Sequence, residues 1–144
     1  MKKLVHIHML VKAYVEKPPM AEQELNIWFT ELVSDINMNV CIPARSNYVD
    51  IPGNRGITGQ VGLSTSHSSC HVWDECSPAM LQFDLYSCAE YDSEKVIAKL
   101  NDFGLLGYEV MLIDREDGFK ILEHRQSPQF TSLKTTNLTA DNKH

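Results

Sequence analysis

Alternation of apolar and polar residues recurs along most of this chain, and it constrains the fold more than any other feature. In residues 4–14 every second residue is apolar: Val5, Ile7, Met9, Val11 and Ala13. Because successive side chains of a β-strand point to opposite faces of a sheet, this period of two predicts a strand with one buried face. The same pattern predicts further strands at 38–44, 57–66, 69–75, 80–88, 108–114 and 119–123.

Only two segments have the period of a helix. The first has apolar residues three and four positions apart: Leu25, Trp28, Phe29, Leu32 and Ile36. The second is expected to begin at the N-cap Asp92 and to end at Gly104. Many one-sided strands with two helices favour an α+β fold, here a two-layer sandwich with an antiparallel sheet and two helices packed on one face. We expect one domain over residues 1–126 and a polar, disordered tail at 127–144.

Charge and hydropathy exclude two classes of partner. The net charge is −6 over 144 residues, and the 13 Lys and Arg residues form no basic run. A nucleic-acid partner is therefore not expected. No segment approaches the ~20 consecutive apolar residues that span a bilayer, so no membrane partner is expected and we predict a cytoplasmic protein.

The cysteine and histidine spacings argue against a metal site. The four cysteines, Cys41, Cys70, Cys76 and Cys88, contain no CxxC pair. In the cytoplasm they are expected to stay reduced. No pair of possible ligands has the spacing of a helical site or a zinc knuckle, a set that comprises His6, His8, His67, Cys70 and Cys76. We therefore predict no metal.

The alternation also predicts where chemistry can occur. The apolar side of each strand must face the helices, so the polar side faces away from them. That uncovered side is expected to carry nucleophilic, titratable and aromatic residues: Thr58, Ser66, His71, Trp73, Glu75 and Cys88. Such a set indicates either a functional site or a subunit interface.

Residues 56–75 read GITGQVGLSTSHSSCHVWDE, and residues 84–89 read DLYSCA. The first segment resembles the prokaryotic S-adenosylmethionine decarboxylase family, whose pattern is Gly-x-Ser/Thr-Gly, then Glu-Ser-His, then His-x-Trp-Pro-Glu. The second resembles that family's Asp-apolar-aromatic-Thr-Cys-Gly. The order of predicted strands and helices fits the family along residues 4–125.

The resemblance implies self-processing. The chain would cut itself between Thr65 and Ser66, and Ser66 would become a pyruvoyl cofactor. Thr58 and His71 match family residues that assist this cut, His71 as an acid–base group. Cys88 matches the residue that returns a proton to the substrate during turnover.

The resemblance also implies a substrate and an assembly. Its enzymes decarboxylate S-adenosylmethionine and so supply the aminopropyl donor for spermidine synthesis. Trp73 and Glu75 match residues near the nucleoside, where a carboxylate can accept hydrogen bonds from both ribose hydroxyls. The family forms homodimers with active sites at or near the subunit interface.

Two departures from the family pattern leave alternatives open. Thr65 stands where the family has glutamate, and Asp74 replaces the proline of Trp-Pro-Glu. One alternative is a pyruvoyl-dependent decarboxylase of ornithine or arginine, which the tryptophan and glutamate of the motif disfavour. The other is an inactive regulatory homologue, which the intact serine, histidine and cysteine disfavour.

Overall fold

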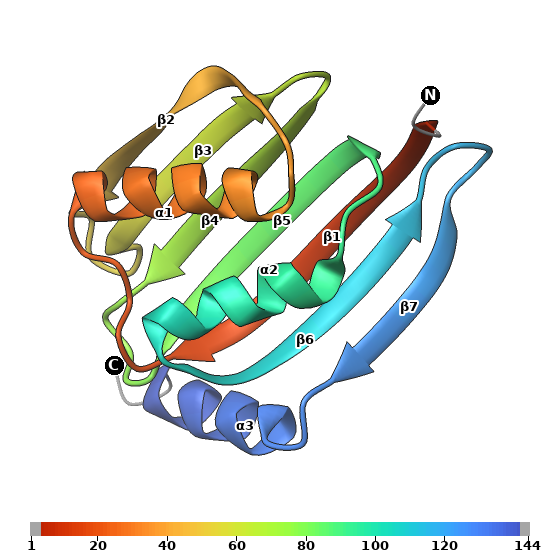
Figure 1. The fold of residues 1–144 in the computed structure, drawn as a ribbon. Helices are drawn as coiled ribbons and strands as arrows, with labels where there is room; N and C mark the ends of the chain where they lie inside the picture. Colours follow the sequence, from red (N-terminus) through yellow and green to blue (C-terminus); the bar gives the residue numbers. More distant parts are fainter. Residues whose placement is uncertain (1–3, 142–144) are drawn as a thin grey trace.

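The computed structural model describes residues 4–141, with side chains up to residue 135. The chain forms a seven-stranded antiparallel sheet and three α-helices (Figure 1). The strands are β1 (Leu4–Val15), β2 (Val40–Val49), β3 (Gly56–Leu63), β4 (Ser66–Trp73), β5 (Ala79–Ala89), β6 (Leu105–Asp114) and β7 (Lys120–Gln126). The helices are α1 (Glu22–Asp35), α2 (Ser93–Leu100), the 3-10 turn η1 (Asn101–Phe103) and α3 (Phe130–Asp141).

The strand order is β2-β3-β4-β5-β1-β6-β7, so the N-terminal strand lies inside the sheet between β5 and β6. The predicted alternation of β1 is confirmed, because Met9, Val11 and Ala13 are buried against the helices. The antiparallel register pairs His8 of β1 with Tyr86 of β5, and Tyr86 with His67 of β4. One row across three neighbouring strands therefore carries polar and aromatic side chains on the other face.

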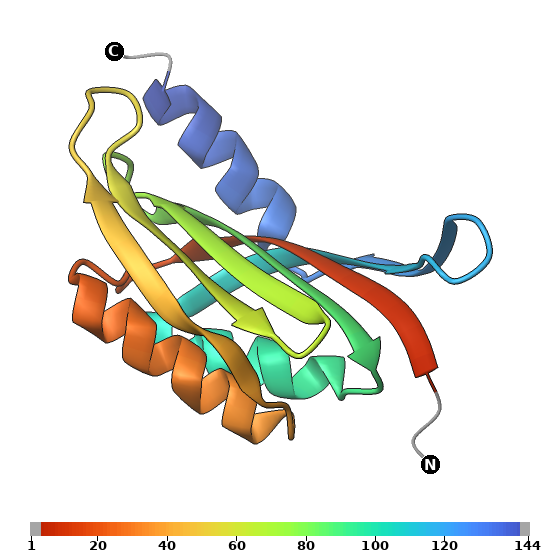
Figure 2. The same ribbon diagram turned by 90° about the horizontal axis from the view of Figure 1, so that it is seen from above.

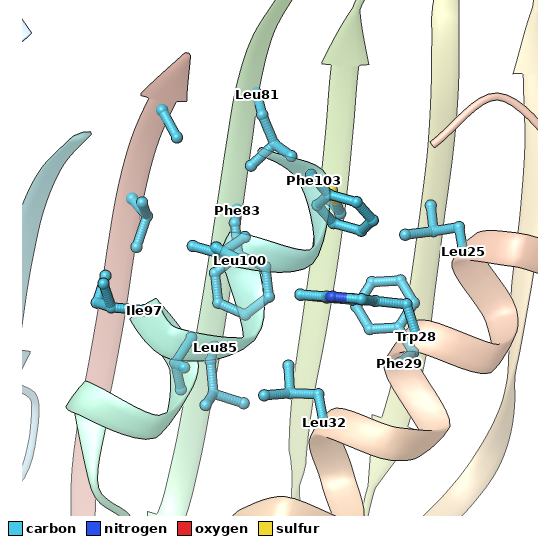
Figure 3. Packing of buried hydrophobic residues seen from close by; sticks show 14 of the residues in the cluster. Leu25, Trp28, Phe29, Leu32, Leu81, Phe83, Leu85, Ile97, Leu100 and Phe103 are labelled. Carbon is cyan, nitrogen blue, oxygen red and sulfur yellow. The ribbon is translucent and has the colours of Figure 1, made fainter. Parts of the chain in front are cut away.

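Helices α1 and α2 cover one face of the sheet and close the hydrophobic core (Figures 1 and 2). Trp28 of α1 lies at the centre of this layer, with ring centroids 4.9 Å from Phe103 and 5.9 Å from Phe83 (Figure 3). Its buried Nε1–H donates to the Lys99 carbonyl oxygen at 3.1 Å, so the indole satisfies its polar atom as well as filling the core. The predicted two-layer α+β sandwich is confirmed.

The predicted ends of the second helix are also confirmed. The Asp92 side chain accepts a hydrogen bond from the backbone N–H of Glu94 at 3.0 Å, which satisfies one free donor of the first turn. Gly104 closes the following 3-10 turn in the left-handed conformation, with φ 67°. Local sequence therefore determines where this helix begins and where its 3-10 extension ends.

The prediction of a single strand over 57–66 is wrong. Strand β3 ends at Leu63, Ser64 and Thr65 form a tight turn, and β4 begins at Ser66. The alternation continues through the turn because the turn contains no Gly, Pro, Asn or Asp to interrupt it. As a consequence Ser66 pairs with Leu63 and shares the strand parity of the buried Ser68. The expectation that Ser66 lies on the uncovered side together with Thr58 is therefore also wrong.

The expectation of a disordered tail is corrected for residues 130–141, which form α3; residues 142–144 lie outside the described part. The helix covers one end of the sheet face opposite α1 and α2 (Figure 2). Phe130 is 1% exposed and its ring lies 5.7 Å from that of Tyr14. Leu133 approaches Gly107 so closely that a Cβ there would come within 2.6 Å of its Cδ1. These apolar anchors hold a segment whose composition is otherwise polar.

Candidate active site

The turn between β3 and β4 holds the predicted scissile bond in an uncommon conformation. Thr65 has φ 62°, in the left-handed region. A β-branched residue rarely adopts this region, and such backbone strain costs on the order of 1–3 kcal/mol. The Thr65 hydroxyl can donate its single proton to the Ser64 carbonyl oxygen, at 2.6 Å, or to Cys88 Sγ, and either bond helps to hold the turn. The predicted scissile peptide bond therefore directly follows a residue with a strained backbone, Thr65.

Ser66 and Cys88 meet beside this turn because β4 begins where β5 ends. The backbone N–H of Cys88 donates to Ser66 Oγ at 3.1 Å. The Ser66 hydroxyl in turn donates to Cys88 Sγ at 3.7 Å. Cys88 Sγ also contacts the Thr65 hydroxyl. The predicted cleavage residues and the predicted proton donor are thus brought together within one chain, and we call Thr65, Ser66 and Cys88 the turn group.

These hydroxyls alter the acidity of the thiol. The hydrogen bond with Thr65, and next the one with Ser66, hold the pKa of Cys88 below its ordinary value. Burial opposes this shift, but it is the smaller effect because Cys88 lies near solvent. The buried Cys70 shows the contrast, since burial alone raises its pKa to about 12. Cys88 is therefore the more acidic and more accessible of the two thiols.

The other predicted site residues form a second group at the far end of the β3–β4 hairpin. Thr58 and His71 are directly paired across the two strands, and Thr58 Oγ1 lies 3.2 Å from His71 Nδ1. The ring of His71 lies 6.4 Å from that of Trp73, which is on the same side of β4. We call Thr58, His71, Trp73 and Glu75 the strand-end group.

Glu75 is held by the loop that joins β2 to β3. Both of its carboxylate oxygens accept from the Gly53 backbone N–H, at 3.0 and 3.1 Å. Arg55 Nη1 lies 3.5 Å from the carboxylate, and Trp73 Nε1–H donates to the Asn54 side chain at 3.2 Å. Asp74, the residue that replaces the family proline, accepts a hydrogen bond from the Tyr48 hydroxyl at 2.8 Å. The loop therefore fixes the aromatic ring and the carboxylate beside one another.

The two groups are separated within one chain. His71 lies five residues beyond Ser66 on the same extended strand, which corresponds to about 16 Å at ~3.3 Å per residue. A histidine at this distance cannot exchange a proton with the Ser66 hydroxyl directly, because such transfer requires hydrogen-bond contact. Within one chain, Ser66 therefore contacts Cys88, whereas His71 contacts Thr58.

A third polar group was missed by sequence reasoning. His8, His67 and Asp84 approach one another on the uncovered face, where the donor atoms all lie within 4.8 Å. The available signal was that His8, like His6, lies on the polar side of the first strand. The strand pairing that brings His8 close to His67 of β4 and Asp84 of β5 cannot be read from sequence spacing. Tyr86 is paired with both His8 and His67, and the guanidinium carbon of Arg115 lies 4.3 Å from the centroid of its ring.

Comparisons with known proteins identify the same family as the sequence motif does. A protein-family model described as S-adenosylmethionine decarboxylase matches residues 7–116. The solved structure of the adenosylmethionine decarboxylase from Aquifex aeolicus is similar over 86% of this chain and 99% of its own, with 18% sequence identity and a TM-score of 0.63. That likeness supports the fold. No curated protein sequence matches the chain.

The family match spans the turn group and the strand-end group, while β7 and α3 lie beyond it. Enzymes of this family are lyases whose pyruvoyl group is made from a serine of the chain by self-cleavage. A hydroxyl at a strained turn beside a thiol fits that chemistry. More than half of the chain matches the family model, and so the chain belongs to the S-adenosylmethionine decarboxylase family, as a pyruvoyl-dependent enzyme that decarboxylates S-adenosylmethionine.

Proposed function

We propose that this enzyme makes its cofactor by cutting the bond between Thr65 and Ser66. The observation that carries the proposal is the position of the Ser66 hydroxyl, next to a strained residue and in contact with both the backbone and the thiol of Cys88. The hydroxyl attacks the Thr65 carbonyl carbon, and the amide becomes an ester. Elimination then breaks the ester C–O bond, releases residues 1–65 with a carboxylate, and leaves dehydroalanine, which water converts to the pyruvoyl group and ammonia.

The pyruvoyl ketone would sit at the new N-terminus of residues 66–144 and supply the electron sink for loss of CO₂. Cys88 is suited to protonate the product carbon, because its thiol lies beside residue 66 in the uncut chain and is open to solvent on one side. Thr65 has a second role in this proposal. Its hydroxyl contacts Cys88 Sγ and so positions the thiol before the cut.

We propose that substrate binds at the strand-end group. Trp73 offers a flat surface for the adenine ring and for the positive sulfonium, a contact worth about 0.5–2 kcal/mol. Glu75 accepts hydrogen bonds from the ribose hydroxyls while the Gly53 N–H keeps the carboxylate in place. Ornithine and arginine have neither an adenine ring nor ribose hydroxyls, so a site of this kind favours a nucleoside substrate.

We also propose that the working enzyme is a homodimer whose sites combine the two groups. The argument is the separation of about 16 Å between Ser66 and His71 of one strand. Ser66 is the first residue of β4 and has the strand parity of the helix-covered side. A second copy packed against the opposite sheet face, which carries Thr58 and His71, could still bring its own pair to the end of β4 at Ser66 of the first. That face exposes apolar side chains that a partner would cover, Leu10 at 38% and Ile42 at 62%.

The cellular setting is proposed on narrower grounds. No helix among residues 4–141 is long and apolar enough to cross a membrane. None of the four cysteines forms a disulfide in the described chain, as is usual in a reducing compartment. The cytoplasm is the compartment that fits, and the dispersed charge gives no reason to expect a nucleic-acid partner.

Two variants expressed together test the cut and the composite site at once. Wild-type protein should separate by intact mass into pieces of 65 and 79 residues (144 − 65 = 79). Ser66→Ala alone should stay whole, because it has no hydroxyl to attack. In a mixed dimer of Ser66→Ala with His71→Ala, the His71→Ala chain should be cut, because its Ser66 meets an intact histidine of the partner.

The control replaces the Ser66→Ala chain by one that carries both Ser66→Ala and His71→Ala. No intact histidine is then present, and the His71→Ala chain should remain whole. If the His71→Ala chain is equally whole in both mixtures, the histidine does not act across the interface. If wild-type protein stays uncut while it still releases CO₂, the pyruvoyl proposal itself is wrong.

A further inference from the structure

Three side chains of the kinds that bind transition metals meet on the uncovered face of the sheet. His8 comes from β1, His67 from β4 and Asp84 from β5. The sheet register brings them together, because His8 and His67 both pair with Tyr86, which is two residues from Asp84. Side chains two residues apart on a strand lie on the same face. One imidazole nitrogen from each histidine and one carboxylate oxygen lie within 4.8 Å of one another.

The carboxylate is held so that one oxygen remains for a ligand. Asp84 Oδ1 accepts from the Ser69 backbone N–H at 3.1 Å and from the Ser69 hydroxyl at 2.5 Å. Asp84 Oδ2 lies 2.8 Å from His8 Nε2 and 3.8 Å from His67 Nε2. Supporting hydrogen bonds of the Ser69 kind orient metal ligands in known sites. Asp84 Oδ2 and the two Nε2 atoms are therefore directed at one small volume.

We propose that His8, His67 and Asp84 bind one divalent first-row transition ion, such as zinc or cobalt. Two imidazoles and a carboxylate are a ligand set that suits such ions, whereas magnesium and calcium prefer oxygen ligands alone. The side chains are 20%, 53% and 23% exposed, in the order named. His67 and Ser69 also line a cavity of about 410 Å³, which leaves space for water or a small ligand on the ion.

The contact between Arg115 and His8 disfavours binding of a cation at this site, and this gives the proposal a sharp test. Its Nη1 lies 3.3 Å from His8 Nδ1. A guanidinium can only donate, so Nδ1 accepts and the proton of neutral His8 resides on Nε2, from which it is donated to Asp84. An ion takes the place of that proton, which moves to Nδ1, and the exposed Arg115 must then turn away. Removal of Arg115 should therefore tighten binding.

The ion site does not depend on self-cutting, so it can be measured on Ser66→Ala, which stays in one covalent state. Untagged Ser66→Ala protein is stripped with a chelator, dialysed, and titrated with Zn²⁺ by calorimetry and with Co²⁺ by visible absorbance. We expect one ion for each chain and cobalt d–d absorption without thiolate charge-transfer bands. His67→Ala, a change at a half-exposed residue, should weaken binding by more than tenfold. Ser69→Ala should weaken it by about tenfold.

Two further variants complete the comparison. Arg115→Gln should bind more tightly than the parent. His124→Gln is the matched control, because His124 also contacts a carboxylate, that of Glu109 at 2.7 Å, but belongs to no three-ligand group among the described residues. It should bind as the parent does. The proposal is overturned if the parent binds no ion, if His67→Ala binds equally well, if His124→Gln is weakened as strongly, or if thiolate bands place the ion on a cysteine.

Discussion

The two ends of the β3–β4 hairpin differ in how they hold the residues of the proposed active site. At the turn, Ser66 is held by a backbone N–H, and the residue before it has a strained backbone. At the other end, Thr58 and His71 are opposite residues of two paired strands, and their side chains meet because the strand register brings them into line. Breaking a peptide bond requires its own backbone to be placed correctly. Acid–base and binding groups need only reach the site, and a second copy of the chain can provide them.

The largest test of this contrast compares Cys88→Ala with His71→Ala. Cys88→Ala should still cut, because the attacking hydroxyl remains, but decarboxylation should fall by about 10²–10⁴-fold. His71→Ala should slow the cutting itself by a similar factor. Cutting is followed by intact mass over time, and turnover by labelled CO₂ release from cut enzyme. If Cys88→Ala blocks cutting as strongly as His71→Ala does, the two ends do not have separate roles.

A smaller effect is expected for substrate capture at the strand-end group. Glu75→Gln should raise KM by roughly 10–100-fold, since a hydrogen bond to a charged group contributes about 1.5–3 kcal/mol. Cutting should proceed as in wild type, because the proposed role of Glu75 is to bind the ribose of the substrate, which takes no part in the cut. The measurement is kcat and KM for S-adenosylmethionine, with Glu22→Gln in α1 as a control for the lost charge. An unchanged KM would remove Glu75 from the binding site.

The turn group can be probed through the acidity of Cys88. The Thr65 hydroxyl lowers the pKa of this thiol, so Thr65→Val should raise that pKa and reduce the thiolate fraction at neutral pH. Alkylation of Cys88 should slow by up to about tenfold, the effect of one hydrogen bond. The difference in alkylation rate should disappear at a pH above the pKa of Cys88 in both proteins.

This comparison is made in Ser66→Ala and in Ser66→Ala/Thr65→Val, which share one uncut state. Valine and threonine are both β-branched, so the strain of the turn is kept. Mass spectrometry reads the rate at each cysteine, and the exposed Cys41 serves as the internal standard. Equal alkylation rates of Cys88 in the two proteins would show that the Thr65 hydroxyl does not influence the thiol.

The smallest effect on chemistry is expected at α3, which packs on Tyr14 of β1 and carries none of the proposed site residues. Phe130→Ala should lower the free energy of unfolding by roughly 3 kcal/mol, because it empties a buried aromatic site. The extent of cutting should not change. Denaturant unfolding is the measurement, and the exposed neighbour Gln129→Ala is the control. Loss of cutting in a Phe130→Ala protein that is still folded would give α3 a role in the active site.

Much of the fold was predictable because its signals are local. The apolar period of two in β1 and the apolar spacing around Trp28 identify the strand, the helix and their buried sides. The cap at Asp92 and the stop at Gly104 depend on single residues. The motif at residues 56–75 and 84–89 identifies the family, and membership of the family identifies the reaction. Each of these features is set by residues a few positions apart.

What the sequence could not determine depends on pairing between distant strands. The turn at Ser64 and Thr65 decides that Ser66 lies beside Cys88 and far from His71, yet the alternation runs through it unbroken. A tight turn without glycine or proline exists here because the strand pairs on both sides hold it. The approach of His67 to Asp84 likewise depends on sheet register. Periodicity names the face on which a side chain lies, but only the register of the folded sheet decides which side chains on that face are neighbours.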